Sequence, residues 1–327
     1  MNLCRLTAAS TGGNDVNIMA LFNALPGACA QGLVWGIMAI GVYITYKILD
    51  LADLSVDGSM CTGGAVCVMM MLSGHSVGVS LLAAFLAGIL AGLATGIFHT
   101  AMGIPAILAG ILTQLGLYSI NLRIMGNRAN QALSATQYDL LISLRNVKGV
   151  PFYENTLLIC LILIVLLIAV LYWFFGTALG CSIRSTGSNP NMSRAQGINT
   201  DFCKLLGLML SNGIVAFSGG LLAQYQGFAD VNMGRGAIVI GLAAVIIGEV
   251  IFRRVRGNFA FTLATVAFGA IIYYLVLQVV LWLGLNANDL KLLSALVVAV
   301  FLAIPHVREK YFAKPVKPVK KGGAPRA

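Results

Sequence analysis

Two carboxylates, Asp53 and Asp57, lie four positions apart in the stretch LADLSVDG. An Asp-x-x-x-Asp pair could hold Mg²⁺ against a diphosphate, because Mg²⁺ is usually bound through one or two carboxylates and the substrate's phosphates. The spacing therefore raises a membrane-embedded, lipid-modifying enzyme as one interpretation. Sites of that kind gather more carboxylates and basic residues than this stretch offers, so we place the enzyme last among the function classes.

Two catalytic patterns are absent from the sequence. There is neither a GxxxxGK[ST] phosphate loop nor an HExxH motif. The seven cysteines lack the spacing of zinc ligands, and His75, His99 and His306 are far apart. The sequence therefore predicts neither catalysis nor a metal or cofactor site.

Composition places the chain in a membrane. Of its 327 residues, 59% are hydrophobic and 10% charged, and the mean hydropathy is +0.90, whereas a soluble domain is about 25% charged. Several apolar runs reach the ~20 residues that cross a bilayer as a helix, and none alternates with the period of a barrel strand. The predicted fold class is an all-α polytopic membrane protein, because a helix satisfies its own backbone in lipid.

We expect nine crossings, some of them short or interrupted. They cover approximately residues 26–49, 58–72, 77–100, 104–125, 155–177, 204–226, 236–252, 257–284 and 289–306.

The basic residues predict the orientation. The loop 253–256, the segment 184–204 and the C-terminal tail all carry Lys or Arg and are separated by two crossings each, so they face one side, which we assign to the cytoplasm. An odd number of crossings places the N-terminus outside. The predicted domains are an extracytoplasmic extension (1–25), a transmembrane domain (26–306) and a basic cytoplasmic tail (307–327). The tail is broken by prolines and lacks a folded basic face with aromatic residues, so we expect no nucleic-acid partner.

Polar side chains inside the predicted crossings are few. No paired carboxylates suggest a proton relay, which a secondary transporter or pump usually needs. The polar residues either hydrogen-bond between helices or line a substrate pathway. The candidates for the pathway are Asp53, Ser55, Asp57, Gln114, Asn121 and Asn212.

Two segments of the sequence resemble each other. LADLSVDGSMCTGGAV begins at Leu51 and FADVNMGRGAIVIGLAAV begins at Phe228, and each has Ala-Asp followed by Gly-rich residues that open a short apolar helix. Inverted repeats with Gly-interrupted helices are typical of transporters, and the breaks tend to line the pathway.

The loop 126–153 is too polar to cross a membrane and too rich in Leu and Ile to be a plain linker. Its stretch YDLLISL could form a short helix on the outer surface. The loop either docks an external partner or closes its own bundle as a packed lid.

The segment RSTGSNPNMSRAQGINTD, residues 184–201, lies between two strongly apolar stretches. Ser188 or Asn189 is a good N-cap with Pro190 in the first helical position, and Gly197 is a natural C-terminal residue. We expect a short helix with a small apolar face that fits the groove of a cytoplasmic partner; a structured but passive loop is the alternative. Its candidate partner-coupling residues are Asn189, Pro190, Met192, Arg194, Gly197 and Ile198.

Three stretches carry a resemblance to a known family. GTALGCSIRSTGSNPNMSRAQGI resembles the coupling-helix region of permeases in the branched-chain amino acid and ribose class of ABC importers. DLSVDGSMCTGGAV is similar to that family's interrupted helix, and the Gly-rich residues from Gly234 around RRVRG are similar to its late crossings. The resemblance covers about residues 26–306. The chain departs from the family in having Asp57 inserted between Val and Gly, and in lacking the extra first crossing of sugar-type members.

The resemblance implies a permease subunit in a bacterial inner membrane, without catalytic activity or a cofactor of its own. It implies a second permease subunit (a homodimer is our expectation), cytoplasmic ATPase subunits that grip the loop 180–203, and an extracytoplasmic solute-binding protein. The implied solute is an amino acid of the branched-chain or aromatic type. A self-contained secondary transporter or channel remains the alternative function, because it explains the composition equally well.

Overall fold

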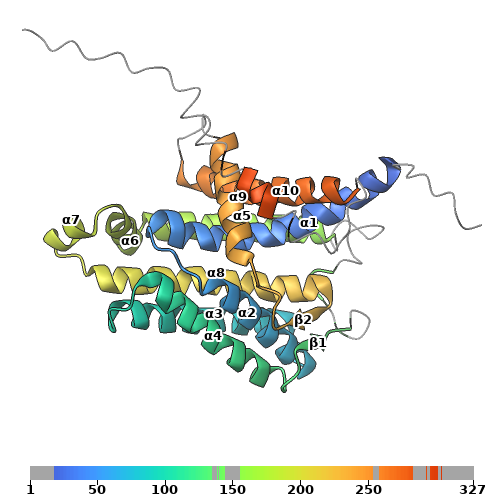
Figure 1. Ribbon diagram of the computed structural model, residues 1–327, viewed down its shortest axis with the longest axis horizontal. Helices are drawn as coiled ribbons and strands as arrows, with labels where there is room; N and C mark the ends of the chain where they lie inside the picture. The colour runs from blue at the N-terminus through green and yellow to red at the C-terminus, as the bar shows by residue number, and fades with distance from the viewer. Residues whose placement is uncertain are drawn as a thin grey trace, which may run out of the picture.

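The structure is a computed structural model that describes residues 18–134, 138, 140–143, 155–252, 258–282, 292, 295–300 and 303. Helices dominate the described residues (Figure 1). In chain order the elements are α1 (Ile18–Tyr43), the π-helix η1 (Ile44–Ile48), α2 (Val56–Leu72), α3 (Val77–Thr100), α4 (Ala106–Ile124), β1 (Asn130–Ala132), α5 (Thr156–Gly176), α6 (Ala178–Ser188), α7 (Pro190–Ala195), α8 (Thr200–Gln226), β2 (Phe228–Asp230), α9 (Ala237–Ile251) and α10 (Phe259–Trp282).

Six described helices are long and apolar enough to cross a membrane: α1 continued by η1, α3, α4, α5, α8 and α10. The apolar helices α2 and α9 have 17 and 15 residues, so at 1.5 Å per residue each is shorter than the ~30 Å hydrocarbon layer. The polytopic helical fold is confirmed. The count of nine crossings and the sides of the termini stay predictions, since most of 289–306, residues 1–17 and the tail lie outside the described residues.

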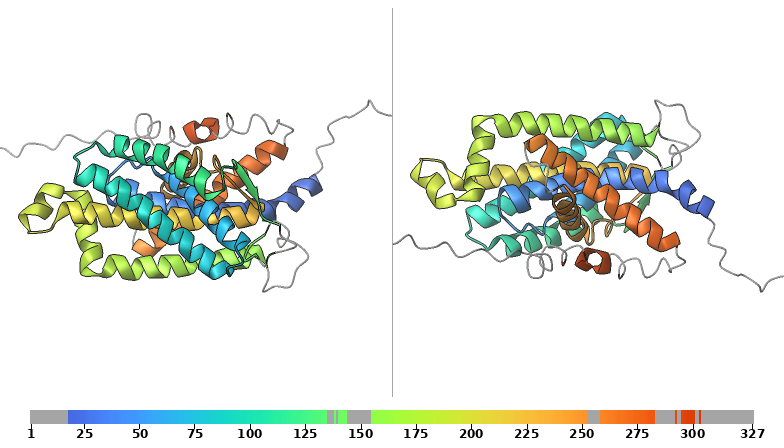
Figure 2. Two further views of the ribbon diagram at one scale, coloured as in Figure 1. Left: turned by 90° about the horizontal axis from the view of Figure 1, so that it is seen from below. Right: turned by 90° about the horizontal axis from the view of Figure 1, so that it is seen from above.

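The centre of the bundle is formed by α1 and α8. In their most apolar 18-residue windows 83% and 72% of the residues are buried, against 17% in α5. Figure 2 shows α5 running along the outside of the bundle, whereas α1 and α8 lie within it. The exposed side of α5 is apolar, with Leu161, Val165 and Trp173 among its exposed side chains, as a lipid-facing helix requires.

Close contact between α3 and α8 depends on the glycines spaced by four in LAGILAGLATG. A β-carbon at Gly88 would collide with the backbone of Asn212, and one at Gly92 would collide with that of Leu208. This spacing of small residues therefore allows the two helices to pack tightly. The contact holds Asn212 in place along one side of α3.

The two ends of the bundle carry different structures. The short helices α6 and α7 lie at one end, and β1 pairs with β2 in an antiparallel ribbon at the other, with Asn130 opposite Asp230 (Figure 1). The prediction of a short helix in YDLLISL is wrong for the part that the structure describes, because residues 138 and 140–143 are not helical. The reason is tertiary: the Leu141 N–H donates to Gln224 Oε1 of α8 at 3.1 Å, and the Ile142 side chain is buried.

Candidate functional site

The chain between η1 and α2 is unwound inside the bundle. Asp50 has a φ of 54°, a left-handed conformation that ends the helical path and that Asp tolerates better than most residues. Residues 49–55 then run back along α8, and Asp53 and Ser55 are buried. The close approach of α4 also depends on this break, because a β-carbon at Gly110 would come within 2.7 Å of the Leu54 backbone nitrogen.

A buried polar cluster forms where this break meets α8. Asp53 accepts hydrogen bonds from the Ser55 N–H at 2.9 Å and from Asn212 Nδ2 at 2.8 Å. Ser59 Oγ donates to Asn212 Oδ1 at 2.6 Å. The Ser55 hydroxyl lies within hydrogen-bonding distance of both the Asp53 carboxylate and Asn212 Oδ1. We call these four residues the inner polar cluster. The structure thus brings together three of the six predicted pathway residues and adds Ser59.

Asp57 does not belong to the inner polar cluster, because its side chain contacts the N-terminus of α9. Its carboxylate accepts hydrogen bonds from the backbone N–H groups of Gly236, at 2.9 Å, and of Ile238, at 3.0 Å. These are unpaired donors at the first turn of α9, where a negative charge also interacts favourably with the helix dipole. A residue in the first turn of α2 therefore caps the N-terminus of α9, and the two short helices meet there.

The two similar segments, which begin at Leu51 and Phe228, also resemble each other in structure. The Ser55 N–H donates to Asp53 Oδ1, and the Asn232 N–H donates to Asp230 Oδ1, so each Asp binds the backbone two residues on. Such local bonds favour turns over helix, and each is followed by a short apolar helix. The second copy has four more residues between its Asp and its helix. Each of the two similar segments therefore begins with a non-helical stretch, held by an Asp turn, in front of a short apolar helix.

A cavity of about 260 Å³ lies between the start of α2, one face of α4 and the segment that leads into α9. Three further predicted pathway residues, Asp57, Gln114 and Asn121, line it. Sequence analysis missed Tyr118 and Arg235, which also line it. Arg235 could have been predicted as a pathway residue, because it lies in the Gly-rich part of the segment that begins at Phe228. The six predicted residues thus form two groups, the inner polar cluster and this cavity.

The predicted helix in the segment 184–201 is confirmed as α7. Asn189 is its N-cap, with Oδ1 accepting from the Met192 N–H at 3.0 Å, and Pro190 is its first residue. Gly197 follows the helix with a φ of 79°, which favours glycine. Ile198 is half-buried and packs against the core.

Two candidate coupling residues differ in their surroundings. Arg194 Nε donates to Thr200 Oγ1 at 2.8 Å, and its guanidinium lies 3.5 Å from the Asp201 carboxylate, so it fastens α7 to the first turn of α8. Met192 is 60% exposed and is free to contact a partner.

The preceding helix α6 was not expected. The chain leaves α5 through Thr177, whose extended backbone and hydroxyl group cap α6. Its side chains are mostly small or polar, so it did not stand out as a helix in the sequence. Ser185 Oγ and Ser193 Oγ lie 2.8 Å apart and join α6 to α7.

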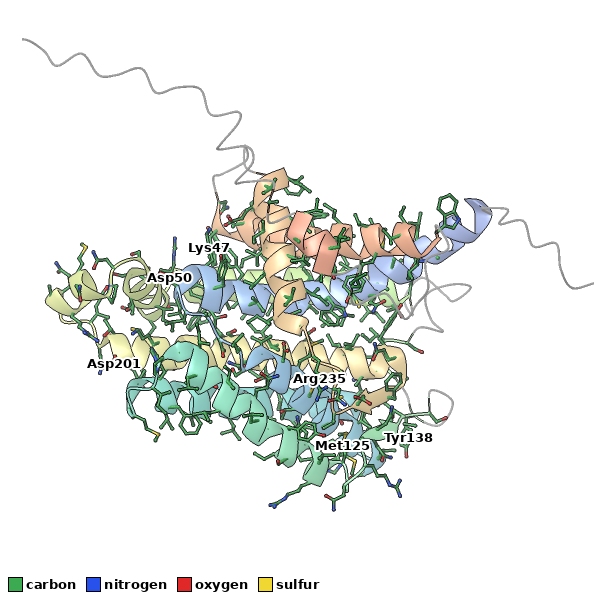
Figure 3. The ribbon with its side chains drawn as sticks, viewed as in Figure 1. Lys47, Asp50, Met125, Tyr138, Asp201 and Arg235 are labelled. Carbon is green, nitrogen blue, oxygen red and sulfur yellow. The ribbon has the colours of Figure 1, made fainter. Side chains whose placement is uncertain are left out.

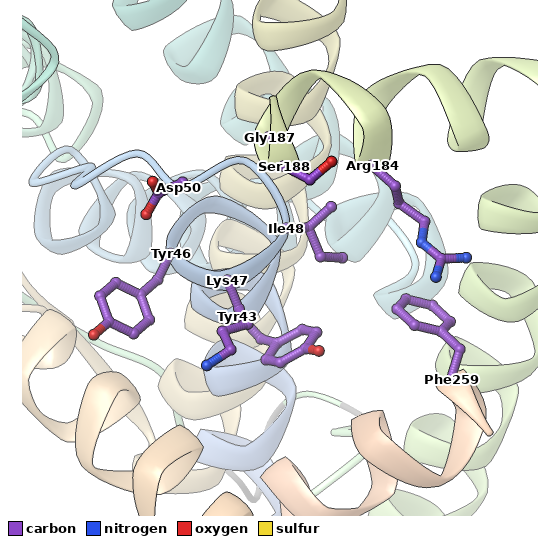
Figure 4. A pocket seen from close by; sticks show the side chains of 9 residues that line it. All are labelled: Tyr43, Tyr46, Lys47, Ile48, Asp50, Arg184, Gly187, Ser188 and Phe259. Carbon is purple, nitrogen blue, oxygen red and sulfur yellow. The ribbon is translucent and has the colours of Figure 1, made fainter. Parts of the chain in front are cut away.

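The end of α6 touches the end of η1. A β-carbon at Gly187 would collide with the carbonyl of Ile48, so only glycine allows this approach. Beside the contact is a cavity of about 550 Å³ whose lining includes Lys47, Asp50 and Arg184. Figure 4 shows Arg184 and Phe259 on one side of it and Asp50 and Tyr46 on the other, and the guanidinium carbon of Arg184 lies 5.3 Å from the centre of the Phe259 ring.

An ion pair also connects two elements near the end of the bundle that carries α6 and α7. Lys47 in η1 and Glu249 in α9 form an ion pair of 3.0 Å. Figure 3 places Lys47 and Asp50 close to one another near this end, and Arg235 farther along the bundle. Helices α7, α6 and η1 thus form a continuous series of contacts, and residues 49–52 connect η1 to the inner polar cluster.

The two carboxylates of LADLSVDG do not form a shared metal site. Asp53 is engaged by Ser55 and Asn212, whereas Asp57 is engaged by the backbone of α9. Within the described ranges no group of three or more His, Cys, Asp or Glu side chains is placed to hold a metal ion. The interpretation as a magnesium-dependent enzyme therefore has no supporting geometry in these residues.

Comparisons with known proteins give a consistent answer. A family model described as "Branched-chain amino acid transport system / permease component" matches residues 26–305. A tyrosine transport system permease protein of Clostridioides difficile (strain R20291) is 42% identical over 275 residues, 84% of this chain and 88% of that protein. An uncharacterized protein of Rickettsia prowazekii (strain Madrid E) is 32% identical over 86% of this chain and 97% of its own. An autoinducer 2 import system permease protein of Salmonella typhi is 27% identical over 65% of this chain and 59% of its own.

Proposed function

Because this chain belongs to the family of branched-chain amino acid transport system permease components, we propose that it forms the path of an amino acid through an ATP-driven importer. It is a multi-pass permease subunit of the ATP-binding-cassette (ABC) class in the bacterial inner membrane, and the family resemblance of its sequence motifs is confirmed. The transmembrane domain of residues 26–306 carries the pathway.

The permease works with partners that bind ATP, deliver the solute and complete the pathway. Cytoplasmic ATPase subunits bind ATP, an extracytoplasmic binding protein delivers the solute, and a second copy of the permease completes the pathway as a homodimer. ATP hydrolysis belongs to the separate ATPase subunits, since the sequence of this chain has no phosphate loop. The loop 126–153 faces the binding protein.

The ATPases act on the loop 180–203, centred on α7. Met192 contacts the ATPase surface, Asn189, Pro190 and Gly197 fix the shape of α7, Ile198 anchors it, and Arg194 joins it to α8. The single observation that carries this proposal is the series that runs by contact from α7 to α6 and from α6 to η1, and then through residues 49–52 of the chain to Asp53 and its hydrogen bond with Asn212. A push on α7 is transmitted along it to the break in front of α2, because packed elements move as rigid bodies.

The solute is an amino acid, with tyrosine as the first candidate. One relative is a tyrosine transport system permease that is 42% identical to this chain over 275 residues. The pathway residues are Asp53, Ser55, Asp57, Gln114, Asn121 and Asn212, which offer hydrogen bonds in a chain with few charges.

The proposal is tested by co-purification. Tagged permease is isolated in mild detergent together with its ATPase, and ATP hydrolysis is measured on the eluate. We expect an ATPase to co-purify with the full chain, and to be lost when residues 189–197 are deleted although the variant is still inserted in the membrane. Recovery of the ATPase with the deletion variant would contradict the role of α7.

A self-contained transporter is the competing function. It predicts that the purified permease, without any ATPase, moves L-tyrosine into liposomes. The importer predicts no uptake under these conditions and restored uptake when ATPase, binding protein and ATP are supplied.

A further inference from the structure

The cavity at the start of α2 has a strongly polar lining. It combines a carboxylate, a guanidinium, two amides and a phenol, from Asp57, Arg235, Gln114, Asn121 and Tyr118. Its volume of about 260 Å³ lies just below the range of about 300–1,000 Å³ typical of ligand pockets. A solute the size of an amino acid suits it better than a larger molecule.

Asn121 is unpaired among the residues that the structure describes. The side chain is 1% exposed, and within the described ranges neither its amide nitrogen nor its amide oxygen has a hydrogen-bond partner. Buried amides are nearly always hydrogen-bonded, because burying one unpaired destabilises the folded chain. Asn121 borders the cavity, so a ligand there is the natural source of the missing hydrogen bonds.

Arg235 is the second unusual residue. It is exposed and lies between the two ends of the bundle (Figure 3), at the N-terminus of α9. Within the described part of the chain its guanidinium has no ion-pair partner. An arginine beside membrane-spanning helices is costly where it contacts lipid and normally faces a water-filled path or an anion.

We propose that this cavity binds the transported solute as a free α-amino acid. Arg235 binds the carboxylate, for which its planar guanidinium is suited, and the amide oxygens of Asn121 and Gln114 accept from the ammonium group. Asp57 adds negative charge beside the ammonium while it holds the start of α9 in position. This inference rests on the proposed function and assigns the residues that recognise the solute.

The first test measures binding without the solute-binding protein. Purified permease with its ATPase is heated with L-tyrosine, L-leucine or tyramine, which lacks the carboxylate, and the melting temperature is recorded. We expect a rise with at least one amino acid and none with tyramine. Arg235→Gln and Asn121→Leu abolish the rise, whereas Arg123→Gln, an exposed arginine outside the cavity, retains it. An equal rise with tyramine, or no rise for the wild type with either amino acid, overturns the proposal.

The second test separates a recognition role from a structural one. Asn121→Leu removes an unsatisfied buried amide at nearly constant volume, so it should raise the melting temperature without ligand while lowering ATP-dependent uptake in proteoliposomes at least tenfold. A merely structural asparagine would change stability and leave uptake intact. If the wild type imports L-tyrosine or L-leucine and the variants import it equally well, this inference fails and the proposed function stands. If ATP drives no uptake of either by the wild type, the proposed function fails with it.

Discussion

Asn212 Nδ2 donates a hydrogen bond of 2.8 Å to the Asp53 carboxylate, across 159 positions of the chain. The bond connects α8, at the centre of the bundle, to the unwound residues before α2. Both side chains are buried, so the carboxylate depends on this amide and on Ser55 for its hydrogen bonds. The relationship explains why a chain with so few polar residues in its apolar stretches keeps an asparagine in the middle of α8.

Removing Asn212 should destabilise the protein markedly. Asn212→Ala takes one donor from a buried carboxylate and leaves the Ser59 hydroxyl without its acceptor. Hydrogen bonds to charged groups contribute about 1.5–3 kcal/mol, so we expect a loss of about 3 kcal/mol. Ser218→Ala is the control in the same helix: it removes one bond to the Val34 carbonyl, at a cost of about 1 kcal/mol. Thermal melts in detergent check whether Asn212→Ala lowers the melting temperature more than Ser218→Ala does. An equal decrease for the two variants would contradict the prediction.

Asp57 should stabilise α9 through two hydrogen bonds and its charge. Asp57→Ala removes both bonds and should cost about 2 kcal/mol. Asp57→Asn keeps one acceptor and loses the charge, so its melting temperature should lie between those of the wild type and the alanine variant. The measurement is the melting temperature of the three purified proteins. An asparagine variant no more stable than the alanine variant would show that the cap is unimportant.

Gly187 should be essential for coupling because α6 touches η1 there. Gly187→Ala forces the Ile48 carbonyl and the end of α6 apart, so we expect ATP-dependent uptake to fall at least tenfold while the permease still binds its ATPase. Gly176→Ala is the matched control, since a β-carbon at Gly176 meets no atom within 4 Å, and uptake should stay within twofold. The assay is solute uptake in proteoliposomes; normal uptake by Gly187→Ala would exclude the contact as a route of transmission.

Met192 should contribute to ATPase binding without contributing to stability. Met192→Glu places a charge on the exposed face of α7, and we expect at least tenfold weaker capture of the ATPase with an unchanged melting temperature. Met102→Glu is the control, because Met102 is 62% exposed in the turn between α3 and α4. Equal loss of the ATPase in both variants would point to a general effect of charge at this end of the bundle.

The sequence predicted the N-cap of α7 to one of two neighbouring residues, Ser188 or Asn189, and the structure selects Asn189. Asn189, Pro190 and Gly197 act through local backbone geometry, which is encoded within a few positions. It missed α6, whose residues are mostly small or polar, and it failed in YDLLISL, where a side chain of α8 holds the backbone in a non-helical conformation. Local signals are reliable where no distant partner competes with them.

The sequence by itself determined a helical membrane protein and the short capped helix, and it supplied the six polar residues that we propose for the pathway. These follow from composition, spacing and capping, which need no knowledge of distant contacts, whereas the family was indicated by the resemblance of three motifs. Only the tertiary structure decided that Asp53 bonds to Asn212, that Asp57 caps α9, and that Asn121 and Arg235 share one cavity. Each of these relationships joins residues far apart in the chain, and which long-range pairs meet depends on how the glycine-lined helices pack.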